Sequence, residues 1–200
     1  MDNYFSTGQA KNIEGSFAGR MLISTPSLDD SIFDHSLIFL CAHDALDGSL
    51  GVIFNQPYSE ISTEELKEQL KIKKQFQINK KYTIFNGGPV DEDKLFILSA
   101  TKEQKKQFKE LAQLTLYTNA EAFLRDVVVG KQKNDFLICK GFSSWAPGQL
   151  EQEIEENSWI LADISFSEIF FGDPSKKWST HLKKVGIKKP EMLVPYSGNA

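Results

Sequence analysis

Short apolar runs recur along the chain, separated by glycine, proline, asparagine and aspartate, which is typical of strands joined by turns. The clearest runs cover residues 19–24, 37–41, 50–54, 82–85, 95–99, 114–117, 136–139 and 159–164. A short loop ending in Asp47-Gly48 joins the second run to the third, which predicts an antiparallel hairpin over residues 37–54. Strands and helices alternate irregularly, so the pattern favours one α+β domain with a mostly antiparallel, bent sheet.

Helices are indicated where a capping residue precedes a segment with helical spacing. Ser62 and Glu65 have the spacing of a capping box, in which each side chain accepts from a backbone N–H of the other residue. Thr118 and Glu121 have the same spacing, so a second capping box is expected there. The Asp-Pro pair at residues 173–174 predicts the start of the last helix.

The stretch from residue 141 to residue 159 organises the second half of the chain. Gly141 is expected to end the strand that precedes it, and Pro147-Gly148 is expected to form a turn. Residues 149–156 then have the apolar and acidic faces of a short helix. Trp159 begins another strand.

Length and composition indicate a single globular domain. The 200 residues are 40% hydrophobic and 25% charged, enough to bury a core without disulfides. We expect a flexible N-terminal arm at residues 1–16, one domain at residues 17–189 and a C-terminal tail at residues 190–200. The first residues lack the basic and apolar segments of a signal peptide, and no apolar run could span a membrane, so a cytoplasmic protein is expected.

The net charge of −4 argues against direct contact with nucleic acid or an anionic membrane, since both need a concentrated basic face. The lysine-rich segment at residues 102–109 is the main exception to this argument. Cys41 and Cys139 each end an apolar run, and they are interpreted as reduced, structural thiols.

Several segments resemble sites of chemistry only weakly. Gly87-Gly88-Pro89 lacks the spacing of a phosphate-binding loop and is better explained as a tight turn. The three histidines are scattered, and a zinc site needs three or four ligands, so no metal is expected. Ser143 and Ser144 do not fit a nucleophile motif. The residues therefore indicate no catalytic group and no cofactor.

Trp145 has two interpretations that the sequence leaves open. It could pack against Pro147 at the end of the sheet, or it could be an exposed recognition residue. Our hypothesis is that loops at the ends of several strands meet on one side, with Trp145 as the aromatic anchor of a shallow polar binding face. The candidate binding residues are His43, Asn55, Gly87, Gly88, Pro89, Trp145, Pro147, Gly148 and Gln149.

Blocks of sequence in a fixed order resemble the YqgE/AlgH family of bacterial proteins over nearly the whole chain. They read LISTP at residues 22–26, LCAHD at 40–44, GSLGVIFNQP at 48–57, GGPV at 87–90, GFSSWAPGQLEQEI at 141–154 and GNA at 198–200. The resemblance implies an α+β fold with bulged, partly barrel-like sheets, similar to a flavin-binding split barrel. It implies no substrate or cofactor, although members are often labelled transcriptional regulators.

The chain departs from the family pattern at two places. Ala42 stands where the family has an acidic residue before the loop histidine, which counts against acid–base catalysis at His43. Ser24-Thr25 replaces an Ala-Met pair before the first proline.

The sequence favours a regulatory or interaction protein that acts through protein partners. One alternative is an enzyme or small-molecule binder that uses a polar cleft between the strand-end loops. The other is a DNA-binding transcriptional regulator, as the family label suggests.

Overall fold

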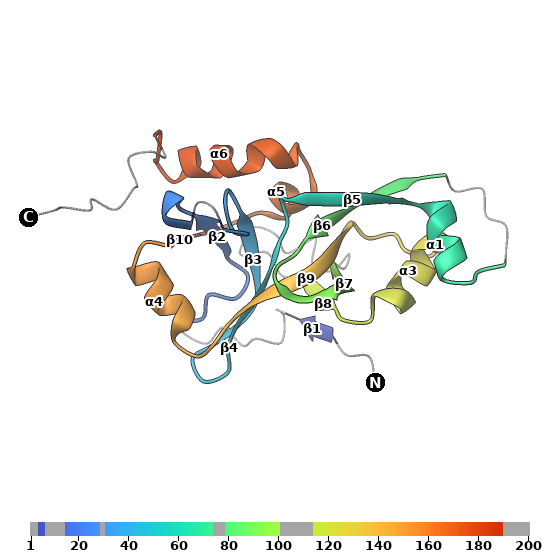
Figure 1. Cartoon of the computed structure of the whole chain (residues 1–200), viewed down its shortest axis with the longest axis horizontal. Coiled ribbons are helices and arrows are strands. Elements are labelled where there is room, and N and C mark those ends of the chain that lie inside the picture. Colours follow the sequence, from blue (N-terminus) through green and yellow to red (C-terminus); the bar gives the residue numbers. More distant parts are fainter. Residues whose placement is uncertain (1–3, 7–14, 29–30, 74–78, 101–113, 190–200) are drawn as a thin grey trace, which may run out of the picture.

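The computed structural model describes residues 4–6, 15–28, 31–73, 79–100 and 114–189. Figure 1 shows these residues folded around one sheet with short helices at its ends and sides. The strands are β1 (Tyr4–Ser6), β2 (Met21–Ser24), β3 (Leu37–Asp44), β4 (Gly48–Ile53), β5 (Pro57–Ser62), β6 (Lys81–Asn86), β7 (Val90–Ser99), β8 (Thr115–Tyr117), β9 (Phe136–Trp145) and β10 (Trp159–Ala162). The helices are α1 (Thr63–Gln69), α3 (Ala120–Val128), α4 (Gln149–Glu155), α5 (Phe166–Phe170) and α6 (Pro174–Lys184), with a 3-10 turn at Pro26–Leu28.

The sheet confirms the predicted α+β fold. Its strand order is β1-β8-β7-β9-β4-β3-β2-β10, and β5 joins the side of this path through β6, which pairs with β9. Among the strand pairs of the described residues, only β6 and β9 run parallel. The sheet is mixed and does not close into a barrel.

The predicted hairpin over residues 37–54 is confirmed. β3 pairs antiparallel with β4, from Ile38 opposite Ile53 to Asp44 opposite Gly48. The register shifts between Leu40 and Ala42, so a β-bulge bends the hairpin at Cys41. Both strands are largely buried.

The strand that was expected to end at Gly141 continues to Trp145. Gly141 has φ +71°, so the chain bends there rather than stopping. Beyond the bend, Phe142 still pairs with Val90 of β7, and residues 143–145 of β9 pair with β4, with Ser143 opposite Gly51 and Trp145 opposite Ser49. Figure 1 shows β9 running through the middle of the molecule and joining its two halves. The turn expected at Pro147-Gly148 is confirmed, and it follows directly after the extended strand.

A close crossing of two chain segments explains the Gly87-Gly88 pair. A Cβ atom on Gly87 would lie 2.3 Å from the carbonyl oxygen of Gly141, and one on Gly88 would lie 2.4 Å from that of Phe142. A Cβ on Gly141 would meet the Gly88 carbonyl oxygen at 2.3 Å. These positions require glycine because the two backbones are in contact. This agrees with a structural role for Gly87-Gly88-Pro89, in place of phosphate binding.

Helix caps agree with the sequence in two places and differ in one. Ser62 and Glu65 form both hydrogen bonds of the predicted capping box at α1. Asp173 caps α6, and Pro174 is its first residue. The capping box expected at Thr118 is wrong, because the cap of α3 is Asn119, whose side chain accepts from the N–H of Ala122. An asparagine one position later competes well for this role.

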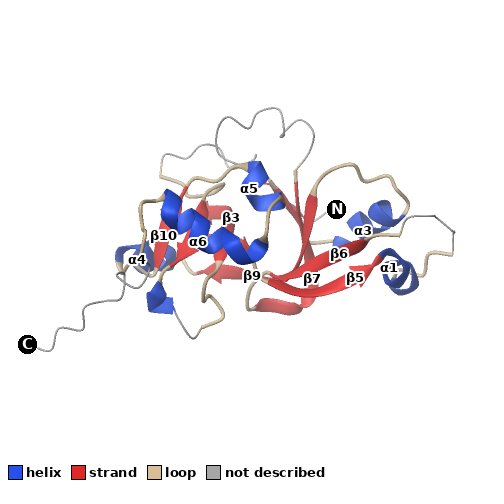
Figure 2. Ribbon diagram, turned by 90° about the horizontal axis from the view of Figure 1, so that it is seen from above, coloured by secondary structure: helices blue, strands red, loops and turns tan. Residues whose placement is uncertain are grey.

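Three apolar clusters hold the helices to the sheet. The largest cluster joins side chains of most of the strands to Trp178 and Leu182 of α6 and Ile169 of α5. The second packs α1 and α3 against β5, β6, β7 and β9, and the third packs α4 against β2, β3, β4 and β10. Figure 2 shows the result: α1 and α3 lie at one end of the molecule, while α4 and α6 lie at the other.

The chain termini were expected to be an arm and a tail. Within the arm at residues 1–16, Tyr4–Ser6 forms β1 and pairs with β8. The tail at residues 190–200 and the lysine-rich segment at residues 102–109 lie outside the described residues. Within the residues that the structure does describe, every helix is too short or too polar to cross a membrane.

Candidate functional site

The structure places the candidate binding residues in three separate regions. His43, Trp145 and Gln149 lie where β4 begins, because His43 and Trp145 both flank Ser49 in the sheet. Asn55 lies just beyond the other end of β4 and contacts Leu37, at the start of β3. Six residues of extended chain separate Leu37 from His43, about 20 Å. Residues 87–89 lie between these regions, so the candidates do not share one face.

Trp145 is packed inside the protein, not presented on its surface. Its side chain belongs to the cluster beneath α4, and the residue is 6% exposed. The indole N–H donates to Oε2 of Glu153 at 2.8 Å, and the indole N–H of Trp159 donates to the same oxygen at 2.8 Å. The two rings meet edge to face, with centroids 6.1 Å apart. Of the two interpretations of Trp145, the geometry favours packing.

Gln149 completes the same network. Its amide nitrogen donates to Oε1 of Glu153 at 2.8 Å, and its amide oxygen accepts from the N–H of Ala146 at 2.9 Å. Pro147 and Gly148 form the exposed turn between β9 and α4. One carboxylate therefore accepts from two tryptophans and a glutamine, and this network attaches α4 to the sheet. No sequence pattern identified Glu153, because its three partners come from two strands and its own helix.

His43 lies in a polar group with Ser49 and Glu151. Its Nδ1 atom is 2.8 Å from Oγ of Ser49, and its Nε2 atom is 3.6 Å from Oε1 of Glu151. Phe17 stacks on the imidazole with ring centroids 4.3 Å apart. The acidic group missing at Ala42 is thus supplied by α4, which sequence reasoning did not find.

The chemistry of this group is limited by burial. A serine, a histidine and a carboxylate are the side chains of a catalytic triad. However, Ser49 is 6% exposed, and Phe17 covers the ring that would activate it. The distance of 3.6 Å to Glu151 also exceeds an ordinary hydrogen bond. The arrangement joins α4 to the β3–β4 hairpin.

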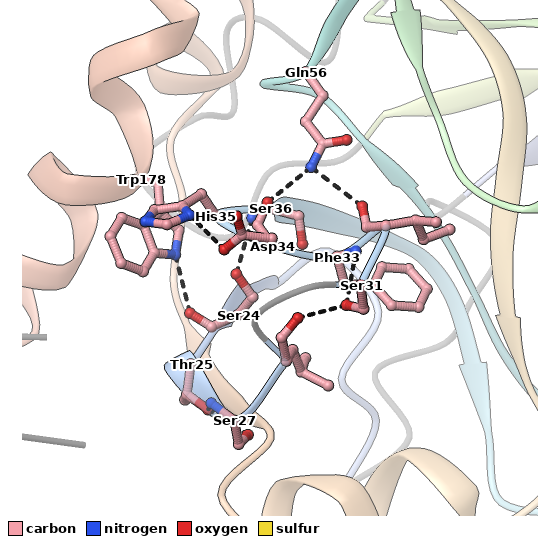
Figure 3. A network of polar contacts seen from close by, with 12 residues as sticks. Ser24, Thr25, Ser27, Ser31, Phe33, Asp34, His35, Ser36, Gln56 and Trp178 are labelled. Atoms are coloured by element: carbon pink, nitrogen blue, oxygen red, sulfur yellow. Dashed lines mark hydrogen bonds and ion pairs between the residues drawn. The ribbon is translucent and has the colours of Figure 1, made fainter. Parts of the chain in front are cut away.

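Asn55 and Gln56 hold the loop before β3 in place. The Asn55 side chain accepts from the N–H of Leu37 at 2.7 Å and donates to the carbonyl of His35 at 2.9 Å. The Gln56 amide donates to the carbonyls of Ile32 and Asp34 at 3.3 and 3.0 Å. Figure 3 shows the Gln56 amide nitrogen directed at these two carbonyl oxygens. Asn55 is buried, and its hydrogen bonds are used within the protein.

The same loop is joined to α6. The His35 ring lies against Trp178, with centroids 4.0 Å apart, and the Trp178 indole N–H donates to the carbonyl of Ser24 at 3.0 Å (Figure 3). The Ser36 N–H donates to Oγ of Ser24 at 2.8 Å. The Ser24 side chain therefore helps to shape the backbone of this loop.

Metal-binding side chains do not gather in the described part of the chain. Groups of three or more histidine, cysteine, aspartate or glutamate residues that could hold an ion do not occur there. Cys41 and Cys139 are both buried and unpaired. Burial raises the pKa of the Cys139 thiol to about 12 and raises that of Cys41 well above its usual range, so neither is primed as a nucleophile.

One exposed feature of the sheet was not predicted from the sequence. β5 forms an edge of the sheet and pairs only with β6 among the described strands. The register shifts between Pro57 and Ser59, which leaves Tyr58 as the extra residue of a β-bulge. Tyr58 is 61% exposed, and the ammonium group of Lys140 lies 4.6 Å from its ring centre. The apolar pattern did not indicate β5, since its first four residues are exposed.

Sequence comparisons agree with the resemblance noted above. A family model described as AlgH-like (DUF179) matches residues 21–190. A UPF0301 protein of Bradyrhizobium diazoefficiens is 35% identical over 207 residues, covering 98% of this chain and 94% of that protein. The UPF0301 protein YqgE of Salmonella newport is 31% identical over 169 residues, covering 83% of this chain and 90% of that protein.

Two solved structures share the fold. The solution structure of the AlgH protein from Pseudomonas aeruginosa superposes with a TM-score of 0.66 at 25% identity, covering 96% of this chain and all of that one. A crystal structure of the Corynebacterium diphtheriae protein DIP2367 superposes with a TM-score of 0.62 at 18% identity, covering 91% of this chain and 94% of that one. Because the family model spans most of the chain and the relatives align over nearly their full lengths, this chain belongs to the AlgH-like (UPF0301) family.

Proposed function

We propose that this chain is a regulatory or interaction protein that acts through protein partners, and that the outer edge of β5 is its contact surface. The observation that carries the proposal is Tyr58, an exposed aromatic side chain at a β-bulge on an edge strand. Bulges that re-aim a side chain are frequent next to functional sites. We further propose that it works in the cytoplasm, because two buried, unpaired cysteines suit a reducing compartment.

The backbone of β5 suits recognition of an extended peptide. An edge strand presents N–H and C=O groups that another strand can pair with, and many domains bind their partners by adding a strand. β5 begins with Pro57, which has no N–H to donate and so limits uncontrolled pairing. Tyr58 supplies the side-chain contact, since tyrosine is enriched among the residues that dominate binding energy.

Two further observations favour an interaction protein over an enzyme or small-molecule binder that uses the strand-end loops, and over a DNA-binding regulator. The hydrogen-bonding groups of the His43, Asn55 and Trp145 regions are engaged inside the protein, which leaves them poorly placed to bind a substrate. The net charge of −4 also disfavours direct contact with DNA.

Site-specific photocrosslinking in the native host tests the proposal. A photoreactive phenylalanine analogue replaces Tyr58, and the matched control carries the same analogue at Val185, which is 40% exposed at the end of α6. We expect a defined cross-linked protein from position 58 and not from position 185. With the captured partner purified, Tyr58→Ala should weaken binding by roughly 30-fold, the effect of losing a dominant contact of about 2 kcal/mol.

The control for folding is the free energy of unfolding of Tyr58→Ala, which should change by less than about 1 kcal/mol because the side chain is exposed. Identical cross-linking from both positions, or unchanged partner affinity in Tyr58→Ala, would refute the assignment of β5 as the contact surface.

A further inference from the structure

A cleft of about 540 Å³ lies between the start of β6, the loop that follows α3 and the end of α5. Its lining consists of Lys80, Tyr82, Val127, Gly130, residues 132–136 and residues 170–171. The volume falls within the range of roughly 300–1,000 Å³ that is usual for small-molecule sites. The cleft contains none of the candidate binding residues discussed above, and it is separate from the exposed face of Tyr58.

Aromatic side chains line the cleft from two sides. Tyr82 and Phe136 lie together on the sheet side, with ring centroids 5.6 Å apart. Phe136 also packs edge to face on Phe123 of α3 at 5.3 Å, which ties this wall to a core cluster. Phe170 and Phe171 line the side formed by α5, and Phe171 is 54% exposed. Rings on two sides favour a flat, apolar guest.

Two lysines give the cleft a positive charge. Lys80 and Lys133 both line it, and both are exposed. Neither ammonium group forms an ion pair within the described residues, whereas Lys67, Lys81 and Lys94 do. Among the described residues of the lining, Asp135 supplies the one carboxylate, so the two lysines leave these residues with a net positive charge.

Hydrogen bonds stabilise the loop that follows α3 at one side of the cleft. The side-chain oxygen of Gln132 accepts from the N–H groups of Lys133 and Asn134 at 2.9 and 2.8 Å. The carbonyl of Asp126 accepts from the N–H groups of Lys131 and Gln132 at 2.9 and 3.1 Å. A binding loop that is ordered before the ligand arrives avoids part of the entropic cost of binding.

We propose that this cleft binds a planar aromatic anion, a ring system that carries a phosphate or carboxylate group. The ring lies between the Tyr82–Phe136 wall and Phe171, and the acidic group pairs with Lys80 and Lys133. This site would make the protein a small-molecule binder in addition to any role of β5, and neither proposal depends on the other.

The test is a calorimetric titration of the full chain with three naphthalene probes. 1-Naphthyl phosphate and 1-naphthoate carry the two acidic groups, and 1-naphthalenemethanol is their neutral counterpart. We expect saturable 1:1 binding of at least one anion, about fivefold tighter than the alcohol, as suits ion pairs at a partly exposed site. The tighter of the two anions identifies the acidic group.

Matched variants locate the site. Lys133→Gln should weaken the preferred anion about fivefold and leave the alcohol unchanged, whereas Phe171→Ala should weaken the anion and the alcohol alike. Lys188→Gln, an exposed lysine beyond α6, is the control and should change neither. Absence of saturable anion binding, or anion binding that Lys133→Gln and Phe171→Ala leave unchanged, would overturn the proposal.

Discussion

Trp145 shows how one side chain can belong to a prominent motif and still serve the fold. Its ring is buried beneath α4, and its N–H shares the Glu153 carboxylate with Trp159. Trp145→Ala should lower the free energy of unfolding by about 3–5 kcal/mol, the usual cost of removing a large core aromatic. Chemical denaturation measures this change.

The matched control for Trp145→Ala is Gln152→Ala, an exposed position on α4. It should change stability by less than about 0.5 kcal/mol. A loss below about 1 kcal/mol in Trp145→Ala would show that the tryptophan does not support the fold as the contacts indicate.

Burial of Lys177 should make the free energy of unfolding depend on pH. The ammonium group donates to the carbonyl of Ile169 at 2.6 Å and lies 5.3 Å from the ring centre of Phe54. Burial lowers the pKa of Lys177 from 10.5 to about 8. The folded protein therefore binds this proton less tightly than the unfolded chain, so burial of the charge destabilises the fold fully below pH about 8 and ceases to do so as the pH approaches 10.5.

Lys177→Met should accordingly raise the free energy of unfolding at pH 7 by about 1–3 kcal/mol, as is common when a well-packed apolar side chain replaces a buried charge. The advantage over the natural chain should shrink between pH 8 and pH 10. Denaturation curves at several pH values measure it, with exposed Lys183→Met as the control. An advantage that stays constant across this range would contradict the assigned pKa shift.

At the scale of elements, β9 decides the architecture because it crosses from one half of the sheet to the other at Gly141. A methyl group at this position would meet a backbone oxygen at 2.3 Å, and the backbone has φ +71°. Gly141→Ala combines a backbone clash with left-handed strain, so it should cost about 2–5 kcal/mol of stability.

Gly148→Ala separates the two effects. Gly148 has φ +77°, but no atom lies within 4 Å of the position that a Cβ would take. It should therefore cost only the left-handed strain, about 1–2 kcal/mol. Equal losses in the two variants, measured by thermal or chemical unfolding, would mean that the crossing of β9 with residues 87–88 does not require close contact.

At the scale of the whole molecule, charge argues against DNA as a direct ligand. The net charge of −4 provides little of the counterion release that drives non-specific binding. We expect duplex DNA to bind with a Kd weaker than about 10 µM at 0.15 M salt, as measured by fluorescence anisotropy. Sub-micromolar binding with a steep salt dependence would instead favour the DNA-binding alternative.

The sequence by itself determined the local elements of this protein and its fold class. Apolar runs located most of the strands, the Asp47-Gly48 loop predicted the antiparallel hairpin, and Ser62 with Glu65 predicted the start of α1. These features depend on residues a few positions apart, whose periodicity and capping hydrogen bonds act within one element.

Only the tertiary structure decided that β9 pairs with strands of both halves of the sheet, that Glu153 and Glu151 contact residues of distant strands, and that Tyr58 is exposed on an edge strand. The indole N–H groups of Trp145 and Trp159 both donate to the carboxylate of Glu153. The acidic partner of His43 lies more than a hundred residues away in the sequence. The pattern of apolar residues does not reveal β5, because most of this edge strand is exposed and needs no apolar face. Such contacts arise from the register between distant strands, which no local spacing in the chain specifies.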